Sequence, residues 1–189
     1  MPSDGTDRYM TISTAVKATD SDSLQLEKLQ RGSLHCVSQC QKLLDQVTEA
    51  SFCESRPGIS SIGAHMRHVL DRYFSFFNGL SDLTVDYDAR KRDPAIESNL
   101  ESARFAVVSI ERRLKDLDLK ANTALTVKET VHHLSSQVLI ESSLARELMG
   151  LITHTTHHLA IIAMIARAQG YELEDDFGKA PSTLVYERS

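Results

Sequence analysis

This 189-residue sequence has no long apolar run and no cluster of basic residues, and it has only three cysteines. The longest apolar stretch, Leu159–Ala166, is far too short to cross a bilayer, which predicts no membrane contact. The N-terminal segment lacks the basic and apolar blocks of a signal peptide, so we expect a cytoplasmic protein. A net charge of −5 without a basic cluster argues against nucleic-acid binding.

Cysteines are few, at positions 36, 40 and 53. An odd number in a reducing compartment argues against a disulfide framework. Cys36 and Cys40 are one helical turn apart, and we interpret them as two small buried side chains rather than a reactive pair.

Several familiar catalytic motifs are also absent. The sequence has no Gly-x-Ser-x-Gly, no Gly-rich phosphate loop, no Cys-x-x-Cys and no His-Glu-x-x-His. These absences exclude the usual signatures of serine hydrolases, nucleotide-binding loops, thioredoxin-like redox sites and zincin proteases.

The composition, 41% hydrophobic and 25% charged, is typical of a folded globular protein. Residues 1–20 are polar and aperiodic, which predicts a disordered lead-in. Residues 21–189 have the length of a single domain with its own core. At the end of the chain, Phe177, Leu184 and Tyr186 are expected to pack back onto that domain.

Apolar residues recur at helical spacing in four segments. The predicted helices run from near Ser23 to Ala50, from a Ser60 or Ser61 cap to Leu80, from an Asp93 cap to Leu117, and from Ser142 or Ser143 to Gly170. The connections between them cover 51–60 and the charged segment 81–93. These features predict an all-α four-helix bundle.

The stretch between the third and fourth helices has a different pattern. Residues 125–140 are β-branched and partly alternating, which is compatible with a short β-hairpin turning at His133–Ser136 and also with a helix.

Histidines in the last predicted helix give the clearest functional signal. His154 and His158 are four residues apart, so they lie on one helical face, on the line predicted to face the interior. Two buried imidazoles need partners for their nitrogens, and one metal ion satisfies both. The competing interpretation is a polar network with Glu147 or with a residue of the second helix.

A metal site needs at least a third ligand, and the second helix offers His65 and His68. Helical geometry alone does not choose between them. Asp71 is a candidate to orient the ring of His68. His157 projects about 100° away from His158, which predicts that it does not bind the same ion. The other histidines, His35, His132 and His133, are predicted to be at the surface.

The loop that contains Asp86, Asp88, Arg90, Lys91 and Arg92 is dense in charge. One hypothesis is a solvated connection, and the other is a polar rim over the metal pocket.

Two of these segments together resemble the DinB/YfiT-like superfamily. The first is the Ser-Ile-Gly-x-x-x-x-His run from Ser61 to His68, and the second is the His-x-x-x-His at His154 and His158. The resemblance covers residues 24–170 and implies His68, His154 and His158 as ligands of a divalent metal, commonly zinc or nickel and sometimes iron. The sequence departs from the family's frequent His-Arg-Gly-Gln run, because Leu159, Ala160 and Ile161 follow His158.

What the resemblance implies about function is a dimeric, metal-dependent enzyme. Characterised relatives are hydrolases, or transferases and isomerases that use a low-molecular-weight thiol. We therefore expect thiol transfer to, or hydrolysis of, a small-molecule substrate. The alternatives are a non-catalytic, dimerising, stress-related protein whose metal is closed off by a fourth ligand such as His65, and a histidine network without metal.

Overall fold

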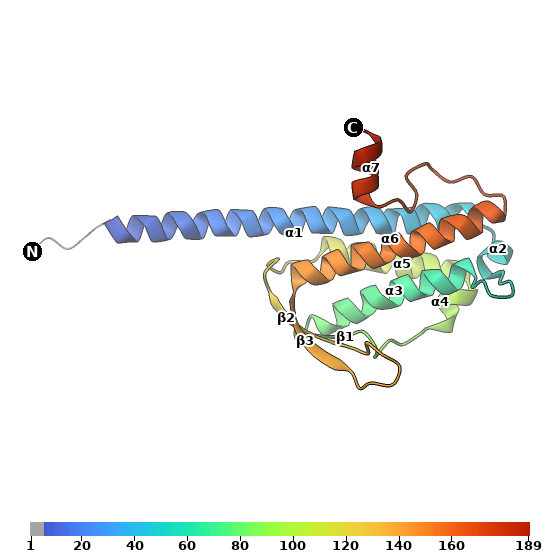
Figure 1. The fold of residues 1–189 in the computed structure, drawn as a ribbon, viewed down its shortest axis with the longest axis horizontal. Coiled ribbons are helices and arrows are strands. Elements are labelled where there is room, and N and C mark those ends of the chain that lie inside the picture. The colour runs from blue at the N-terminus through green and yellow to red at the C-terminus, as the bar shows by residue number, and fades with distance from the viewer. Residues whose placement is uncertain (1–5) are drawn as a thin grey trace, which may run out of the picture.

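The computed structural model describes residues 6–189, with side chains described from residue 21 onward (Figure 1). In chain order the elements are α1 (Thr6–Gln46), α2 (Glu49–Cys53), α3 (Ile62–Gly79), β1 (Thr84–Asp86), α4 (Pro94–Ser98), α5 (Leu100–Lys115), β2 (Ala124–Glu129), β3 (Val138–Ser143), α6 (Leu144–Ala168) and α7 (Pro181–Glu187). The lead-in predicted over residues 1–20 falls outside the residues whose side chains are described. The first helix begins at Thr6, well before the predicted start near Ser23.

Four long helices enclose one hydrophobic core. α1 contacts both α5 and α6, and α3 contacts the same two helices, so α1 and α3 lie diagonally across the core from each other. Figure 1 shows α3, α5 and α6 gathered along the C-terminal half of α1, whose N-terminal half extends beyond them. Each helix carries an apolar stripe, and burying these stripes against one another removes them from water.

The apolar stripe predicted on the first helix is confirmed. Cys36, Cys40, Leu43 and Val47 are each at most 4% exposed. Burial raises the pKa of both thiols, that of Cys36 to about 11, so both are protonated at neutral pH. Cys36 and Cys40 are therefore small buried side chains, as predicted.

Serine caps fix the starts of the two helices that carry the histidines of interest. The Ser61 hydroxyl accepts a hydrogen bond from the Ala64 amide in α3, and the Ser143 hydroxyl accepts one from the Arg146 amide in α6. Just after α6, Gly170 has φ +90°, a conformation that favours glycine. Both helix starts and the end at Gly170 agree with the sequence prediction.

The most buried face of α6 differs from the predicted one. The predicted line is buried at Leu144 and Leu151, in the first half of the helix, and only half-buried where it continues through His154, His158, Ile161 and Ile165. The fully buried line runs beside it, through Leu148, Ile152, Thr155, Leu159, Ile162 and Ala166. Because α6 packs on α1 and α3 together, the residues between these two contacts are the deepest. The histidines therefore lie at the edge of the core.

The third predicted helix is divided in two. Asn99 has an extended backbone (φ −140°, ψ 122°), ends α4 and caps α5 through its side chain, which accepts from the Ser102 amide. The predicted start is correct, since Asp93 caps α4 and Pro94 opens it. The predicted seam is also buried on both sides of the break, from Ile96 to Leu114.

A small sheet lies where α3 ends and α6 begins (Figure 1). β2 and β3 pair antiparallel with Glu129 opposite Val138, which confirms the predicted hairpin. β1 pairs parallel to β2, with Val85 opposite Val127. The segment 81–93, predicted as a charged connection between helices, also contributes the strand β1, which was not predicted. The all-α prediction is corrected accordingly: in its described part the protein is mostly helical with a three-stranded sheet.

The C-terminal tail packs back only in part. Phe177 is 5% exposed and joins the core as predicted, but Tyr186 in α7 is 82% exposed. By length and composition alone, α6 could cross a membrane, a test that core helices of soluble proteins also pass. The contacts of α6 with α1 and α3 give its apolar residues a partner inside the protein.

Gly79 lets α3 approach β1 closely, and this predicts a selective effect of an added methyl group. A Cβ at Gly79 would lie 2.7 Å from Val85 Cα and closer still to the Thr84 carbonyl oxygen. Both neighbours are backbone, so we expect Gly79→Ala to lower the free energy of unfolding by about 1–3 kcal/mol. Urea denaturation measures this change.

The matched control is Gly150→Ala, inside α6. Its added Cβ meets nothing nearer than an Arg146 side-chain nitrogen at 3.5 Å. This control is expected to be neutral or to stabilise the protein by up to about 1 kcal/mol, because alanine is the better helix former. Equal unfolding free energies for the two variants would contradict the close packing of α3 on β1.

Candidate metal centre

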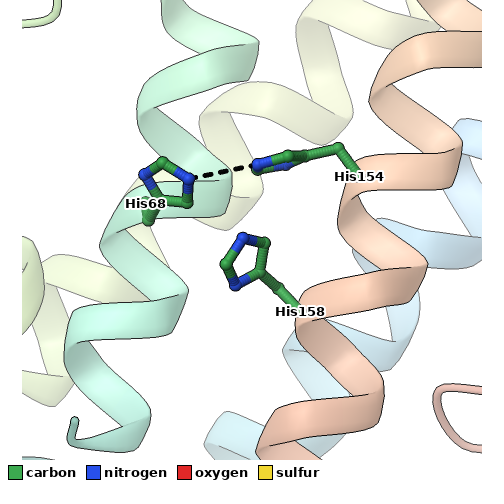
Figure 2. Close-up of side chains that lie close together, drawn as sticks. All are labelled: His68, His154 and His158. Carbon is green, nitrogen blue, oxygen red and sulfur yellow. Dashed lines mark hydrogen bonds between the residues drawn. The ribbon is translucent and has the colours of Figure 1, made fainter. Parts of the chain in front are cut away.

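Three histidine rings meet between α3 and α6 (Figure 2). One ring nitrogen from each of His68, His154 and His158 lies within 4.8 Å of the other two. His154 and His158 come from successive turns of α6, and His68 faces them from α3. The structure thus brings together the three residues that the sequence singled out, and they could hold a metal ion.

The spacing of the rings suits a shared ion after small side-chain movements. Nε2 of His154 and Nε2 of His68 are 3.1 Å apart. The ring centroid of His158 lies 4.5 Å from that of His154 and 4.7 Å from that of His68. Nitrogen ligands of a tetrahedral zinc lie roughly 3.4 Å from one another, given zinc–nitrogen bonds of about 2.0–2.1 Å.

His65 contacts the cluster through His158 without joining it. Nδ1 of His65 and Nδ1 of His158 are 3.1 Å apart. A histidine that binds metal through Nε2 keeps its proton on Nδ1 and donates it to an acceptor. Nδ1 of His65 can be that acceptor for His158. His65 therefore has the place of a supporting partner, and it is outside the group of three.

The remaining histidines lie apart from the cluster. His157 is exposed, and its ring stands edge-on to that of His158, with centroids 5.2 Å apart. His35, His132 and His133 are exposed, as predicted.

Arg90 occupies the outer nitrogen of His68. The guanidinium of Arg90 lies 2.9 Å from Nδ1 of His68, and an arginine can only donate there. Nδ1 of His68 must then accept, which places the proton of the neutral ring on Nε2, opposite His154. A metal ligand needs the reverse, with Nε2 free. Asp71, predicted to orient His68, makes no hydrogen bond to it in the described part of the chain.

One ring nitrogen of His154 makes no hydrogen bond. This atom is Nδ1, which is buried. Glu147, the predicted competitor for the histidines, is engaged elsewhere: it accepts from the hydroxyl groups of Tyr87 and Ser142. Glu147 therefore forms no network with the histidines of α6. The other predicted partner, a residue of the second helix, is present, because His68 contacts His154.

All histidines of the cluster are held neutral at physiological pH. Burial is the main cause, and it lowers the pKa of His154 to about 3 and those of His68 and His158 to about 4. Positive neighbours add to the effect, Arg72 at His154 and Arg90 at His68. Neutral imidazole is the form that binds metal, so no proton has to be displaced at pH 7.

Arg72 is fixed beside the cluster by the sheet. It forms a 2.6 Å ion pair with Glu129 of β2, and its guanidinium lies 3.9 Å from the ring centre of Tyr87. Arg72 is half-buried, and Arg67 and Arg90 also act on His68. These arginines give the surroundings of the three histidines a positive electrostatic potential. Arg72 was not predicted to be a site residue, and Arg90 was considered only as part of a polar rim, because their contacts depend on β1, β2 and the loop between β1 and α4.

The charged loop is partly a rim of the site. Arg90 reaches His68, whereas Asp88 accepts hydrogen bonds from Thr130 and Gln137 in the hairpin loop. Lys91 and Arg92 are exposed. Arg90 therefore fits the hypothesis of a polar rim, and Lys91 and Arg92 fit the hypothesis of a solvated connection.

A cavity opens next to the cluster on the side of His65. It has a volume of about 510 Å³ and is mainly apolar, with Ile59, Ile161, Met164 and Ile165 among its lining residues beside His65. Of the histidines near the site only His65 lines this cavity, which is large enough for a small molecule.

Comparisons with family models, curated proteins and solved structures give no match to this chain. Nothing in them bears on the DinB/YfiT-like resemblance, which rests on the histidine motifs alone.

The Arg90–His68 contact predicts that Arg90 weakens metal binding. Arg90→Gln removes both an obligatory donor at Nδ1 and a positive charge near the ligands. We expect the zinc affinity to rise by roughly tenfold, the usual scale of such supporting contacts. Competition with a chromophoric chelator measures the dissociation constant.

Arg92→Gln is the matched control, because it removes the same charge from an exposed neighbour in the same loop. Its zinc affinity should stay within about twofold of the unchanged protein if the contact itself matters more than the overall field. Equal gains in both variants would show that Arg90 acts only through its charge.

The lowered histidine pKa values predict acid sensitivity of the metal-free protein. Unfolded histidines titrate near pH 6.5, while the folded cluster resists protonation until about pH 4. Between these limits the unfolded chain binds more protons, so the free energy of unfolding falls as pH falls. Urea titrations of chelator-treated protein between about pH 7 and about pH 5.5 should show it, before most carboxylates titrate.

His154→Gln isolates the contribution of the cluster. The free energy of unfolding of this variant should fall less steeply with falling pH than that of the unchanged protein, because one fewer proton is taken up on unfolding. Identical slopes in His154→Gln and in the unchanged protein would contradict the depressed pKa of His154.

Proposed function

We propose that this protein is a divalent-metal-dependent enzyme with the four-helix-bundle architecture of the DinB/YfiT-like superfamily. His68, His154 and His158 hold the ion, zinc or nickel first and iron as a further candidate. The reaction is thiol transfer to, or hydrolysis of, a small electrophilic molecule. The supporting observation is the convergence of three neutral histidine nitrogens within 4.8 Å of one another at the edge of the core.

A divalent ion on three histidines, with a position left open, supplies Lewis acidity that makes a water or thiol nucleophilic at neutral pH. The protein's part is to hold its ligands unprotonated. Burial lowers the pKa of each ligand histidine well below 7, and the hydrogen bond between Nδ1 of His65 and Nδ1 of His158 fixes the ring of His158. No carboxylate lies within the group of three, so its ligands are uncharged.

The surroundings of the histidines favour an anionic nucleophile or leaving group. Arg72 and Arg90 place two guanidinium groups beside the ligands, and both contribute to the low pKa of His68. A thiolate, hydroxide or carboxylate entering this field gains electrostatic stabilisation.

The mainly apolar cavity beside His65 fits the non-reacting part of the substrate. If Nδ1 of His65 accepts a proton from His158, Nε2 of His65 carries its own hydrogen. Because His65 lines the cavity, this N–H can donate to an oxygen of a bound molecule. His65 would then orient the substrate while it supports the ligand His158.

The non-catalytic alternative requires a closed metal site. His65 was the candidate for the fourth ligand that closes the site. Its Nδ1 contacts Nδ1 of His158, and His65 is not part of the group of three. Among the described residues, only three histidine, cysteine or carboxylate side chains form a group able to hold an ion. An open position favours an enzyme.

The same resemblance leads us to propose a homodimer in the cytoplasm. Sedimentation of the purified protein tests the dimer independently of the metal chemistry.

The decisive experiment combines metal content with turnover. The protein as purified, and after reloading with zinc, nickel or iron, is assayed on a panel of small electrophiles with and without low-molecular-weight thiols. We expect about one equivalent of metal and metal-dependent turnover. His158→Ala should lose both, with kcat/KM falling to the background rate because one of three ligands is gone.

His132→Ala is the control, since this exposed histidine lies in the hairpin loop away from the cluster. Its metal content and kcat/KM should match those of the unchanged protein. Metal retained in full by His158→Ala would refute the ligand assignment. Metal binding without turnover on any electrophile would instead favour the non-catalytic alternative.

A further inference from the structure

A second, larger cavity lies along α3 beyond the histidine cluster. Its volume is about 760 Å³, and it is enclosed by α3, the segment from Ala89 to Ile96, and α5. None of its lining residues is a histidine. Ala89 and Lys91 line this cavity, while Arg90 between them reaches His68. The two sites are therefore neighbours on either side of one loop segment.

Two polar side chains of α3 face this cavity without partners. Asp71 is 5% exposed and Ser75 is 8% exposed, and both line the cavity. They are four residues apart, so they lie on the same helical face. Within the described residues, no hydrogen bond or ion pair reaches either side chain. Burial raises the pKa of Asp71, against the opposing effect of nearby arginines.

The carboxylate oxygens of Asp71 make no hydrogen bond within the described residues and are reachable by solvent from the cavity, so they are free to accept from a donor that enters it. The other charged groups of the lining are already engaged. Asp93 caps α4 and approaches Lys91 at 3.9 Å, and Glu101 pairs with Arg104. Asp71 is thus the carboxylate in this cavity that is left for a ligand.

The remaining walls are apolar and partly aromatic. Phe74 and Phe105 line the cavity together with Ile96 and Ala106. Phe105 is 77% exposed, so an aromatic ring of α5 stands open at its edge. An acidic floor with apolar walls suits a ligand that has a positive end and a hydrophobic body.

We propose that this cavity binds a small amphipathic amine. Its ammonium group donates to the carboxylate of Asp71 and to the hydroxyl of Ser75, and its apolar or aromatic body lies against Phe74 and Phe105. An anion is disfavoured, because the charged lining consists of Asp71, Asp93 and Glu101 against the single Lys91. This is a binding site separate from the proposed metal centre.

The test is calorimetric titration of the full chain with three probes that share a phenyl body. These are 2-phenylethylamine, the uncharged 2-phenylethanol and the anionic 3-phenylpropionate. We expect the amine to bind with one-to-one stoichiometry and a Kd of about 1 mM or tighter. The alcohol and the acid should bind at least about tenfold more weakly, since they lack the charged donor.

Asp71→Asn is the matching variant, because it keeps the shape of the side chain and removes its charge. Amine affinity should fall at least about tenfold. Glu101→Gln removes a carboxylate from the same lining, but one already paired with Arg104, and it should keep the affinity within about twofold. Amine binding that is no tighter than alcohol binding, or unchanged in Asp71→Asn, overturns the proposal.

Two further measurements keep the result interpretable. Phe105→Ala alters an exposed side chain, so it should fold even if Asp71→Asn does not, and it should weaken amine binding several-fold. Unchanged affinity in that variant also counts against the site. Titrations of chelator-treated and zinc-loaded protein should both show amine binding, which separates a failure here from a failure of the metal assignment.

Discussion

The packing of α3 against α6 is the contact on which the candidate site depends. Each helix alone presents histidines at helical spacing, and neither can bind an ion tightly with two nitrogens. The Ser61 and Ser143 caps fix where the helices begin, and their shared contact sets the ring of His68 against those of His154 and His158. Because the deepest line of α6 is apolar, the histidines lie at the edge of the core, where burial suppresses protonation and a ligand can still approach.

Hydrogen bonds to the outer nitrogens divide the three candidate ligands. His158 faces Nδ1 of His65, which can accept its proton, His154 has a buried Nδ1 without a partner, and His68 faces a donor in Arg90. Only the first arrangement matches what a metal ligand requires. The loop that carries Arg90 therefore controls which tautomer His68 adopts. The same loop lines the cavity of Asp71, so both sites depend on its residues.

The spacing of apolar residues predicted the helices that bury one face and expose the other. The capped starts of α3 and α6 and the end at Gly170 carry local signals of one or two residues, whereas the first helix was predicted from its apolar stripe and its start at Thr6 was missed. β1 was missed because it contributes a single buried apolar residue, Val85, and depends on pairing with β2 for its hydrogen bonds. The break at Asn99 was missed because the apolar seam continues across it without a change of spacing.

The sequence by itself determined which residues are chemically able to form the site: His154 and His158 through their four-residue spacing, with His65 and His68 as candidates from a second helix. The DinB/YfiT-like resemblance implied His68, and only the tertiary structure shows that His68 joins the group of three while His65 does not, because this depends on how α3 is rotated against α6. The structure also assigned Arg72 and Arg90 to the site and left Asp71 facing a cavity. Such contacts join segments far apart in the chain, and no local pattern of residues encodes them.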